Sequence, residues 1–121
     1  MGEAINLDER FAQFSDKWSP KVIARLNDYE VKVARLQGEF VWHEHSDIDE
    51  LFLVLDGRLT IRLRERNVVL APGELYVVPR GVEHCPQADG EVRVLLLEPA
   101  GVVNTGGAGG PLTAGYDDSL A

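Results

Sequence analysis

The sequence lacks most of the features that mark secreted, membrane-spanning or nucleic-acid-binding proteins. Its one cysteine, Cys85, cannot form an internal disulfide, which excludes the cross-linked framework of a small secreted domain. No apolar run approaches the roughly 18 residues that a transmembrane helix needs. Lysine and arginine together number 12 against 20 aspartate and glutamate residues, which gives a net charge of -8. Because an acidic surface repels phosphate backbones and anionic lipids, neither nucleic acid nor a membrane is an expected partner.

A targeting signal is also missing from the start of the chain. Residues 1–10, MGEAINLDER, have neither the basic region nor the apolar region of a secretory signal peptide, so the expected location is the cytoplasm. The 121 residues suit one domain, and their 45% hydrophobic fraction is typical of a globular protein. We divide the chain into an N-terminal helical segment at 1–20, a β-barrel domain at 21–102 and a Gly-rich C-terminal tail at 103–121.

The N-terminal segment has the spacing of an amphipathic helix. Asn6 is a suitable N-cap, and Pro20 would stop a helix that has begun there. We therefore predict a helix over residues 6–18, packed against the outside of a sheet or forming part of a subunit interface. Its apolar residues recur at intervals of three or four, at Leu7, Phe11, Phe14 and Trp18.

The central part of the chain, from about residue 21 to residue 98, reads as short strands separated by turn dipeptides. Apolar residues at 59, 61 and 63 alternate with polar residues at 60, 62 and 64, the period of a strand with one solvated face. Asp56-Gly57 predicts a hairpin between the apolar strands on its two sides. This pattern, without a strand–helix–strand rhythm, predicts an all-β domain, an antiparallel barrel or sandwich. Further turns are expected at Asn27-Asp28, Arg66-Asn67, Pro72-Gly73, Arg80-Gly81 and Asp89-Gly90.

The composition changes again after Val103. Residues 104–110, NTGGAGG, offer little apolar surface to bury and have high backbone freedom, so we expect residues 103–121 to form a flexible tail. Tyr116 is the residue in this tail that could anchor it to the barrel or to a partner chain.

All three histidines of the sequence fall in two short clusters. In the first cluster His43 and His45 are two residues apart, so on a strand both side chains point to one face, about 7 Å apart along the chain. That geometry lets two imidazoles bind one metal ion. In an unbroken strand Asp49 would share the face of His45, whereas a break near residues 46–47 would bring Glu50 there instead. The spacing alone leaves both carboxylates open.

The second cluster leads to His84. Gly73 and Pro79 fix turns at the two ends of an apolar strand, and Gly81 allows a backbone conformation that side chains forbid. His84 then follows at the point where the chain re-enters the sheet. The second cluster therefore predicts a third imidazole at the edge of the same domain.

Together the two clusters resemble the paired motifs of the cupin superfamily. Two departures exist: the gap between Gly38 and His43 is four residues instead of five, and Ala88 replaces an asparagine that is not a metal ligand in the family. The first motif is matched by Gly38, His43, His45, Glu50 and Gly57, and the second by Gly73, Pro79, Gly81 and His84.

The resemblance covers roughly residues 31 to 98 and implies a small antiparallel β-barrel or jelly roll with a metal ion inside. It implies one divalent ion per chain, of Mn, Fe, Zn, Ni or Co, and a carboxylate ligand at Glu50 rather than Asp49. Three neutral imidazoles and one carboxylate suit a first-row cation of this kind. The implied ligand set is His43, His45, Glu50 and His84.

Cupins include dioxygenases, isomerases, epimerases, decarboxylases, storage proteins and ligand-sensing domains, so the resemblance does not assign a reaction. Small bacterial cupins similar to this chain are often described as mannose-6-phosphate-isomerase-like. Our first hypothesis is a metal-dependent enzyme, of isomerase or dioxygenase type, on a small oxygen-rich metabolite. The second is a non-catalytic module that binds a metal ion or a small ligand. Since short cupins commonly pair through their sheets, we expect a homodimer with a small-molecule ligand.

Other side chains near the motifs have weaker assignments. Trp42 is expected in the core rather than as a substrate platform, and Phe52 and Tyr76 could line a pocket, although aromatic residues in barrel strands usually belong to the core. Cys85 is expected to face away from the metal as a buried, inert thiol. No general base outside the four implied ligands stands out, so no catalytic residue is assigned. A basic stripe on the solvated face is expected from Arg62, Arg64 and Arg66.

Overall fold

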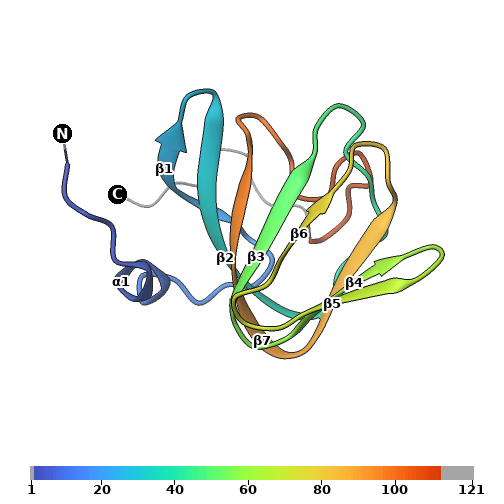
Figure 1. Ribbon diagram of the computed structural model, residues 1–121, viewed down its shortest axis with the longest axis horizontal. Coiled ribbons are helices and arrows are strands. Elements are labelled where there is room, and N and C mark those ends of the chain that lie inside the picture. The colour runs from blue at the N-terminus through green and yellow to red at the C-terminus, as the bar shows by residue number, and fades with distance from the viewer. Residues whose placement is uncertain (1, 113–121) are drawn as a thin grey trace.

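The structure, a computed structural model that describes residues 2–112, is a mostly antiparallel β sheet with one short helix (Figure 1). Its elements in chain order are α1 (Leu7–Phe11), β1 (Lys21–Leu26), β2 (Tyr29–Glu39), β3 (Glu50–Asp56), β4 (Leu59–Leu63), β5 (Asn67–Leu70), β6 (Leu75–Val78) and β7 (His84–Pro99). The strands are ordered β1-β2-β7-β3-β6, with β4 paired to both β5 and β7. The sheet is not closed into a complete barrel. This arrangement confirms the predicted all-β, jelly-roll class.

β7 is the strand that joins the two halves of the sheet. Its residues 92–99 lie between β2 and β3, whereas its residues 84–87 pair with β4. Between these parts Leu36 pairs with Val92 but Gly38 pairs with Ala88, so the register with β2 shifts and β7 bulges. Residues 89–90 lie in this bulge. The prediction that they form a turn ending a strand is therefore wrong, since β7 continues through them.

The turn at Asp56-Gly57 is present, but it does not form the predicted hairpin. β3 pairs with β6 and β7, and β4 pairs with β5 and β7, so the strands on its two sides do not pair with each other. Gly57 has a φ of 84°, and a Cβ there would lie 2.7 Å from the Glu91 carbonyl oxygen. This close approach to β7 lets the chain cross from one half of the sheet to the other. A two-residue hairpin would instead have paired β3 with β4 in the same half.

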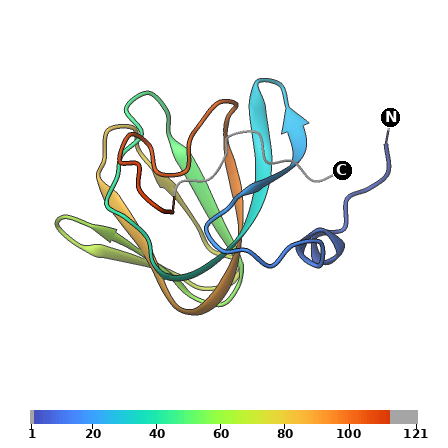
Figure 2. The same ribbon diagram turned by 180° about the vertical axis from the view of Figure 1, so that it is seen from behind.

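The N-terminal helix is shorter than its apolar spacing predicts. Asn6 caps it as expected, since its side chain accepts a backbone hydrogen bond of 3.0 Å, but the helix ends at Phe11 instead of residue 18. Arg35 of β2 donates to the carbonyl oxygens of Phe11 and Phe14, at 2.8 and 3.0 Å. Those carbonyls are therefore satisfied by the sheet instead of by a continuing helix. In both views α1 lies outside the sheet, on the side away from β4 and β5 (Figures 1 and 2).

Trp18 also leaves the predicted helix to enter the core. Its φ of 59° is left-handed, which an α-helix does not accommodate. Its ring stacks on Phe40 at a centroid distance of 4.5 Å, and its Nε1 donates to the Gln37 carbonyl oxygen at 2.9 Å. The apolar position that sequence spacing assigns to a helix face is thus used to fill the interior of the sheet.

Along the inner face of the sheet the side chains change from apolar to polar. On β2 Ala34 and Leu36 belong to the hydrophobic core, as do Val54 on β3 and Val94 on β7. Toward the start of β2 and β3 and the end of β7, the inward side chains are charged although each is at most 4% exposed. Buried charges need partners, so this end of the sheet is where a polar site is expected. These residues are Glu30, Lys32, Glu50 and Glu98.

The segment after β7 packs against this polar end of the sheet. Asn104 donates through Nδ2 to the carbonyl oxygens of Trp18 and Leu112, each at 2.8 Å, and Thr105 is fully buried. A Cβ at Gly106 would collide with the Glu44 carbonyl oxygen. Residues 104–106 thus pack on the domain, where the composition predicts a free tail, whereas residues 107, 108, 110 and 111 are exposed. Tyr116 lies outside the described residues.

The structure also bears on membrane insertion. Within residues 2–112, no helix combines the length and the apolar composition that a membrane-spanning helix requires.

Candidate metal centre

The two segments that carry the histidines are held together by their backbones. The His43 amide donates to the His84 carbonyl oxygen at 3.0 Å, and the His84 amide donates back to His43 at 2.9 Å. The Gly81 amide also donates to the His45 carbonyl oxygen, at 2.9 Å. Residues 40–49 are not a regular strand, but these bonds place them beside the first residues of β7. The two sequence clusters thus form one site.

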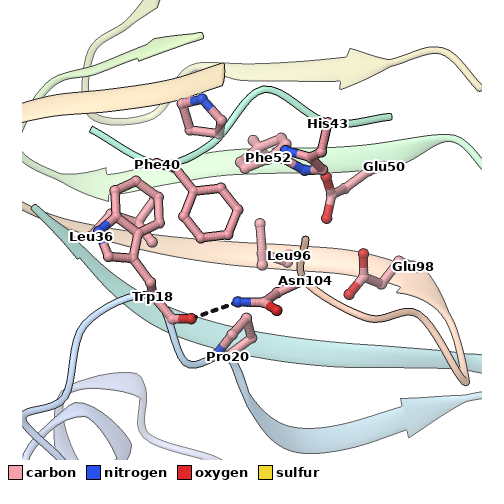
Figure 3. Close-up of a pocket in the computed structure, with 11 residues that line it drawn as sticks. Trp18, Pro20, Leu36, Phe40, His43, Glu50, Phe52, Leu96, Glu98 and Asn104 are labelled. Carbon is pink, nitrogen blue, oxygen red and sulfur yellow. Dashed lines mark hydrogen bonds between the residues drawn. The ribbon is translucent and has the colours of Figure 1, made fainter. Parts of the chain in front are cut away.

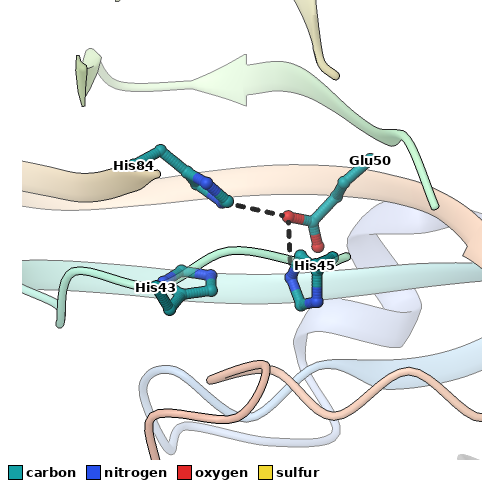
Figure 4. Close-up of side chains that lie close together, drawn as sticks. All are labelled: His43, His45, Glu50 and His84. Atoms are coloured by element: carbon teal, nitrogen blue, oxygen red, sulfur yellow. Dashed lines mark ion pairs between the residues drawn. The ribbon is translucent and has the colours of Figure 1, made fainter. Parts of the chain in front are cut away.

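Four side chains converge from these segments and from β3 (Figure 4). Each offers one possible ligand atom, and these atoms all lie within 4.8 Å of one another. Every one of the four side chains is buried, with an exposed fraction of 8% or less. The set is His43, His45, Glu50 and His84. The structure therefore brings together the four residues singled out by the sequence, and it shows that they could hold one metal ion.

The backbone sets which nitrogen of two of these imidazoles faces the cluster. Nδ1 of His43 lies 2.9 Å from the Val41 carbonyl oxygen, and Nδ1 of His84 lies 2.9 Å from the Val82 carbonyl oxygen. Since a carbonyl oxygen only accepts, each Nδ1 carries the hydrogen and each Nε2 keeps its lone pair. A hydrogen bond of this kind orients a metal-binding histidine and raises its basicity.

Three of the converging atoms have no hydrogen-bond partner among the described residues: Nε2 of His45, Nε2 of His84 and Oε1 of Glu50. The Glu50 oxygen lies 3.5 Å from the first nitrogen and 3.6 Å from the second. Buried polar atoms without partners are costly and rare in proteins. A divalent cation among them would satisfy all three at once, so the residues present fit a metal ion.

The protonation states of the cluster also suit a cation. Burial and the neighbouring His84 lower the pKa of His43 to about 4, which leaves its imidazole neutral at pH 7. Burial by itself raises the pKa of Glu50, but the neighbouring His45 and His84 side chains outweigh it, and the pKa is lowered. Both residues are therefore deprotonated near neutral pH, the form in which they bind metals.

The structure distinguishes Asp49 from Glu50, the two adjacent carboxylates between which the residue spacing did not decide. Glu50 opens β3 and points into the cluster, 4% exposed. Asp49 lies on the surface, where its Oδ1 accepts from the Arg80 amide at 2.9 Å and from the Arg80 Nε at 3.3 Å. These hydrogen bonds lower the pKa of Asp49 and hold its side chain away from the histidines. The chain is irregular from residue 46 to residue 49, which resets the side-chain alternation in favour of Glu50.

A cavity adjoins the cluster and shares two of its residues, His43 and Glu50 (Figure 3). It measures about 30 Å³, room for roughly two water molecules. Its aromatic and aliphatic walls lie at one end, and Glu50 and Glu98 lie at the other. The remaining lining residues are Trp18, Pro20, Leu36, Phe40, Phe52, Pro86, Leu96 and Asn104.

Sequence reasoning missed Glu98 and Asn104 in this lining. Glu98 continues the inward alternation of Val94 and Leu96 on β7. The period-two pattern of the sequence could therefore have predicted a carboxylate on the inner face. Asn104 had no such signal, because it follows the last strand and reaches the cavity through its bonds to Trp18 and Leu112.

Glu98 belongs to a buried row of charges. Its Oε1 accepts from Lys32 Nζ at 2.9 Å, and Lys32 lies 3.8 Å from a carboxylate oxygen of Glu30. Burial, with the nearby charge of Glu50, raises the pKa of Glu98 well above its usual range, and Lys32 opposes the shift. Glu98 is therefore the more easily protonated of the two carboxyl groups beside the cavity.

The other residues that the sequence singled out have mixed positions. Phe52 lines the cavity, as expected, but Tyr76 is not among the lining residues. Trp42 is half-buried beneath two arginines instead of packing in the core: the Arg64 guanidinium carbon lies 3.8 Å from its ring centroid and that of Arg62 lies 5.4 Å away. Cys85 is fully buried, and burial raises the pKa of its thiol, in agreement with an inert role.

The comparison with protein families agrees with the motifs. The family model described as a cupin domain matches residues 30–98. The protein YdbB of Bacillus subtilis (strain 168) is 37% identical over 82 residues, which cover 67% of this chain. The match spans 66% of YdbB, just under two thirds of its length.

Solved structures agree with the fold. A cupin-2 domain containing protein from Shewanella frigidimarina NCIMB 400 has a TM-score of 0.78 and 49% identity, covering 78% of this chain and 93% of that one. Protein NMB1881 from Neisseria meningitidis has a TM-score of 0.74 and 26% identity, covering 80% of this chain and 99% of that one. Nearly the whole length of both proteins is therefore matched.

Proposed function

This chain belongs to the cupin domain family, and on that premise we propose that it is a metal-dependent enzyme acting on a small oxygen-rich metabolite. The observation that carries the proposal is the buried set of three imidazoles and one carboxylate, in which three converging atoms lack a hydrogen-bond partner among the described residues. Such a donor set suits one divalent first-row ion, of Mn, Fe, Zn, Ni or Co. When bound, the ion would supply Lewis-acid chemistry, or reactivity with O₂ if it is iron. Isomerase and dioxygenase reactions are the two types that we favour.

The chain's own residues support this proposal in two ways. Val41 and Val82 orient the imidazoles of His43 and His84 through their carbonyl oxygens, so the site is organised before any ion arrives. The cavity beside the cluster has largely apolar walls and is lined by His43 and Glu50, so a ligand group that enters it would lie next to the ion.

A second candidate is a non-catalytic module that binds a metal ion or a small ligand. The size of the cavity favours it, because about 30 Å³ admits little more than water in this conformation. The two candidates differ in one property: an enzyme needs an exchangeable position on the ion and turns a substrate over.

The first test is the metal content of protein purified without chelator or metal-affinity tag. Elemental analysis should find about one first-row metal per chain in the wild type and none in the His43→Ala/His45→Ala double variant. A matched Asp47→Asn/Asp49→Asn variant, changed at two acidic residues of the same loop, should keep its metal. A wild type that contains no metal and takes none up on titration would overturn the proposal.

The second test separates the two candidates. Protein loaded with Co²⁺ should change its visible absorption spectrum when azide is added, because azide can occupy an exchangeable position. An unchanged spectrum would leave the metal site intact and favour the non-catalytic module. Turnover of a hydroxy acid or sugar by the metal-loaded protein, absent from the double variant, would establish the enzyme.

A further inference from the structure

Among the described residues, Glu98 is the one carboxyl group that lines the cavity outside the four candidate ligands. It is 2% exposed and projects inward from β7. Its Oε1 is held by Lys32 at 2.9 Å, whereas its Oε2 has no hydrogen-bond partner among the described residues. One half of this carboxyl group is therefore anchored and the other half is available to a bound molecule.

The pair with Lys32 accounts for only one oxygen of Glu98. A buried carboxyl group is costly unless both of its oxygens are hydrogen-bonded, and Oε2 of Glu98 has no such partner among the described residues. Glu50 and Glu98 both line this cavity, so a molecule bound in it would lie beside both carboxyl groups.

The rest of the cavity limits what that molecule can be. Its walls are the aromatic and aliphatic side chains around Trp18, Phe40 and Leu96 (Figure 3). No lysine or arginine is among the residues that line it within the described chain, and the nearby Lys32 is already paired with Glu98. A phosphate group would therefore enter without a counter-charge from the protein, next to two carboxyl groups.

We propose that Glu98 selects the ligand of the metal centre by hydrogen bonding a hydroxyl group next to the ligand's metal-binding group. The inference rests on the proposed function and names its substrate class: small hydroxy acids or hydroxycarbonyl compounds without a phosphate. A hydroxyl group donates to a carboxylate and accepts from a carboxylic acid, so this recognition operates with either form of Glu98. Lys32 keeps the Glu98 carboxyl group in place by holding Oε1.

The test uses two small probes that differ by one hydroxyl group, glycolate and acetate. Calorimetric titration of metal-loaded protein gives the ratio of the acetate dissociation constant to the glycolate dissociation constant. Because glycolate also chelates metals by itself, the informative quantity is the change in this ratio between variants. Replacing Glu98→Leu should lower the ratio about tenfold, as expected for the loss of one hydrogen bond to a charged or strongly polar group.

Two further variants keep the test decisive. Glu98→Gln retains one hydrogen-bonding oxygen and the size of the side chain, so it should lower the ratio by less and serves if the leucine variant does not fold. Glu91→Gln changes a carboxyl group on the same strand, paired with Lys17 and Arg35 outside the cavity, and should leave the ratio unchanged. 2-Phosphoglycolate should bind more weakly than glycolate to the wild type.

The outcomes separate this inference from the function on which it rests. A folded, metal-loaded Glu98→Gln or Glu98→Leu protein with the wild-type ratio overturns the inference and leaves the metal centre standing. Tight binding of 2-phosphoglycolate overturns the substrate class. A wild type that takes up no metal overturns the proposed function, and the inference falls with it.

Discussion

Asp49 and Glu50 are neighbours of similar chemistry, yet only Glu50 lies among the histidines. The difference arises because Arg80 holds the Asp49 side chain at the surface while β3 begins with Glu50 turned inward. We predict that Glu50→Gln weakens metal binding by more than the roughly 10- to 100-fold cost of losing an outer-shell partner. Asp49→Asn should leave the affinity close to that of the wild type. Competition titrations against a coloured chelator measure both.

The metal affinities of these two variants decide which of the two carboxylates binds the metal. If Asp49→Asn lost the metal and Glu50→Gln kept it, the carboxylate would be assigned to Asp49, against the geometry described above.

His43 links protonation to the stability of the metal-free protein. Its pKa in the folded chain is about 4, against 6.5 for the free side chain, because burial disfavours the charged form. Between these pH values the unfolded chain binds a proton that the folded chain does not. Stability is therefore fully present above about pH 6.5 and declines as the pH falls toward about 4. We predict that His43→Asn reduces the slope of the unfolding free energy against pH in this range by up to about 1.4 kcal/mol per pH unit.

Urea unfolding of chelator-treated protein, at intervals between about pH 4.5 and about pH 7.5, measures this slope. The same slope in the wild type and the variant would show that another group governs the pH dependence.

At the scale of elements, the segment after β7 depends on a single glycine for its contact with the histidine loop. Gly106 has a φ of 58°, and an added Cβ would collide with the Glu44 carbonyl oxygen. We predict that Gly106→Ala displaces residues 103–112 and destabilises the protein by about 1 kcal/mol or more. Gly107→Ala is the matched control, because nothing lies within 4 Å of its Cβ position and its φ is not left-handed.

Hydrogen exchange measures this displacement directly. The Gly106 amide donates to the Val103 carbonyl oxygen and the Ala108 amide to that of Thr105, at 2.9 and 3.0 Å, so both amides should exchange faster in Gly106→Ala. Equal exchange in the two alanine variants would show that the segment tolerates a side chain at residue 106.

At the scale of the whole molecule, the outer face of the sheet opposite the metal centre is apolar across four strands. β6 is an edge strand, and its Leu75 and Val77 are 56% and 41% exposed. Exposed apolar edges favour association. We propose that this face pairs two copies of the chain, which is the homodimer expected from the sequence. Its two rows, aligned by strand register, are Val31, Leu97, Leu51 and Val77, and Leu95, Leu53 and Leu75; Val33, which pairs with Leu95, is fully buried and does not belong to this face.

Sedimentation or light scattering at micromolar concentration tests this pairing. The wild type should have about twice the chain mass of 13.4 kDa, and Leu75→Lys/Val77→Lys should have the mass of one chain, since buried like charges repel. Val69→Lys, which changes an exposed valine on β5, should remain a dimer. A wild type of 13.4 kDa would overturn the proposal.

Local spacing was sufficient for the all-β class of the fold and for the three histidines, whereas the choice of Glu50 came from the resemblance to cupins. Period-two alternation and turn dipeptides act over a few residues, and the predicted turn at Asn27-Asp28 is present between β1 and β2. The turn predicted at Arg66-Asn67 is displaced: the chain bends at residues 64–65, and Asn67 already pairs in β5. The two histidine motifs were recognisable because their residue spacing reflects strands and turns of fixed length. Whether the four side chains bind metal stays a prediction until the ion is measured.

What only the tertiary structure decided depends on contacts between distant residues. The helix ends at Phe11 because Arg35, 24 positions later, takes its carbonyl oxygen. The Asp56-Gly57 turn connects the two halves of the sheet instead of forming a hairpin, because Gly57 packs on β7. Lys32 and Glu98, 66 positions apart, form one buried pair beside the cavity. Local propensity carries no information about such pairs, because their free energy depends on which strands become neighbours.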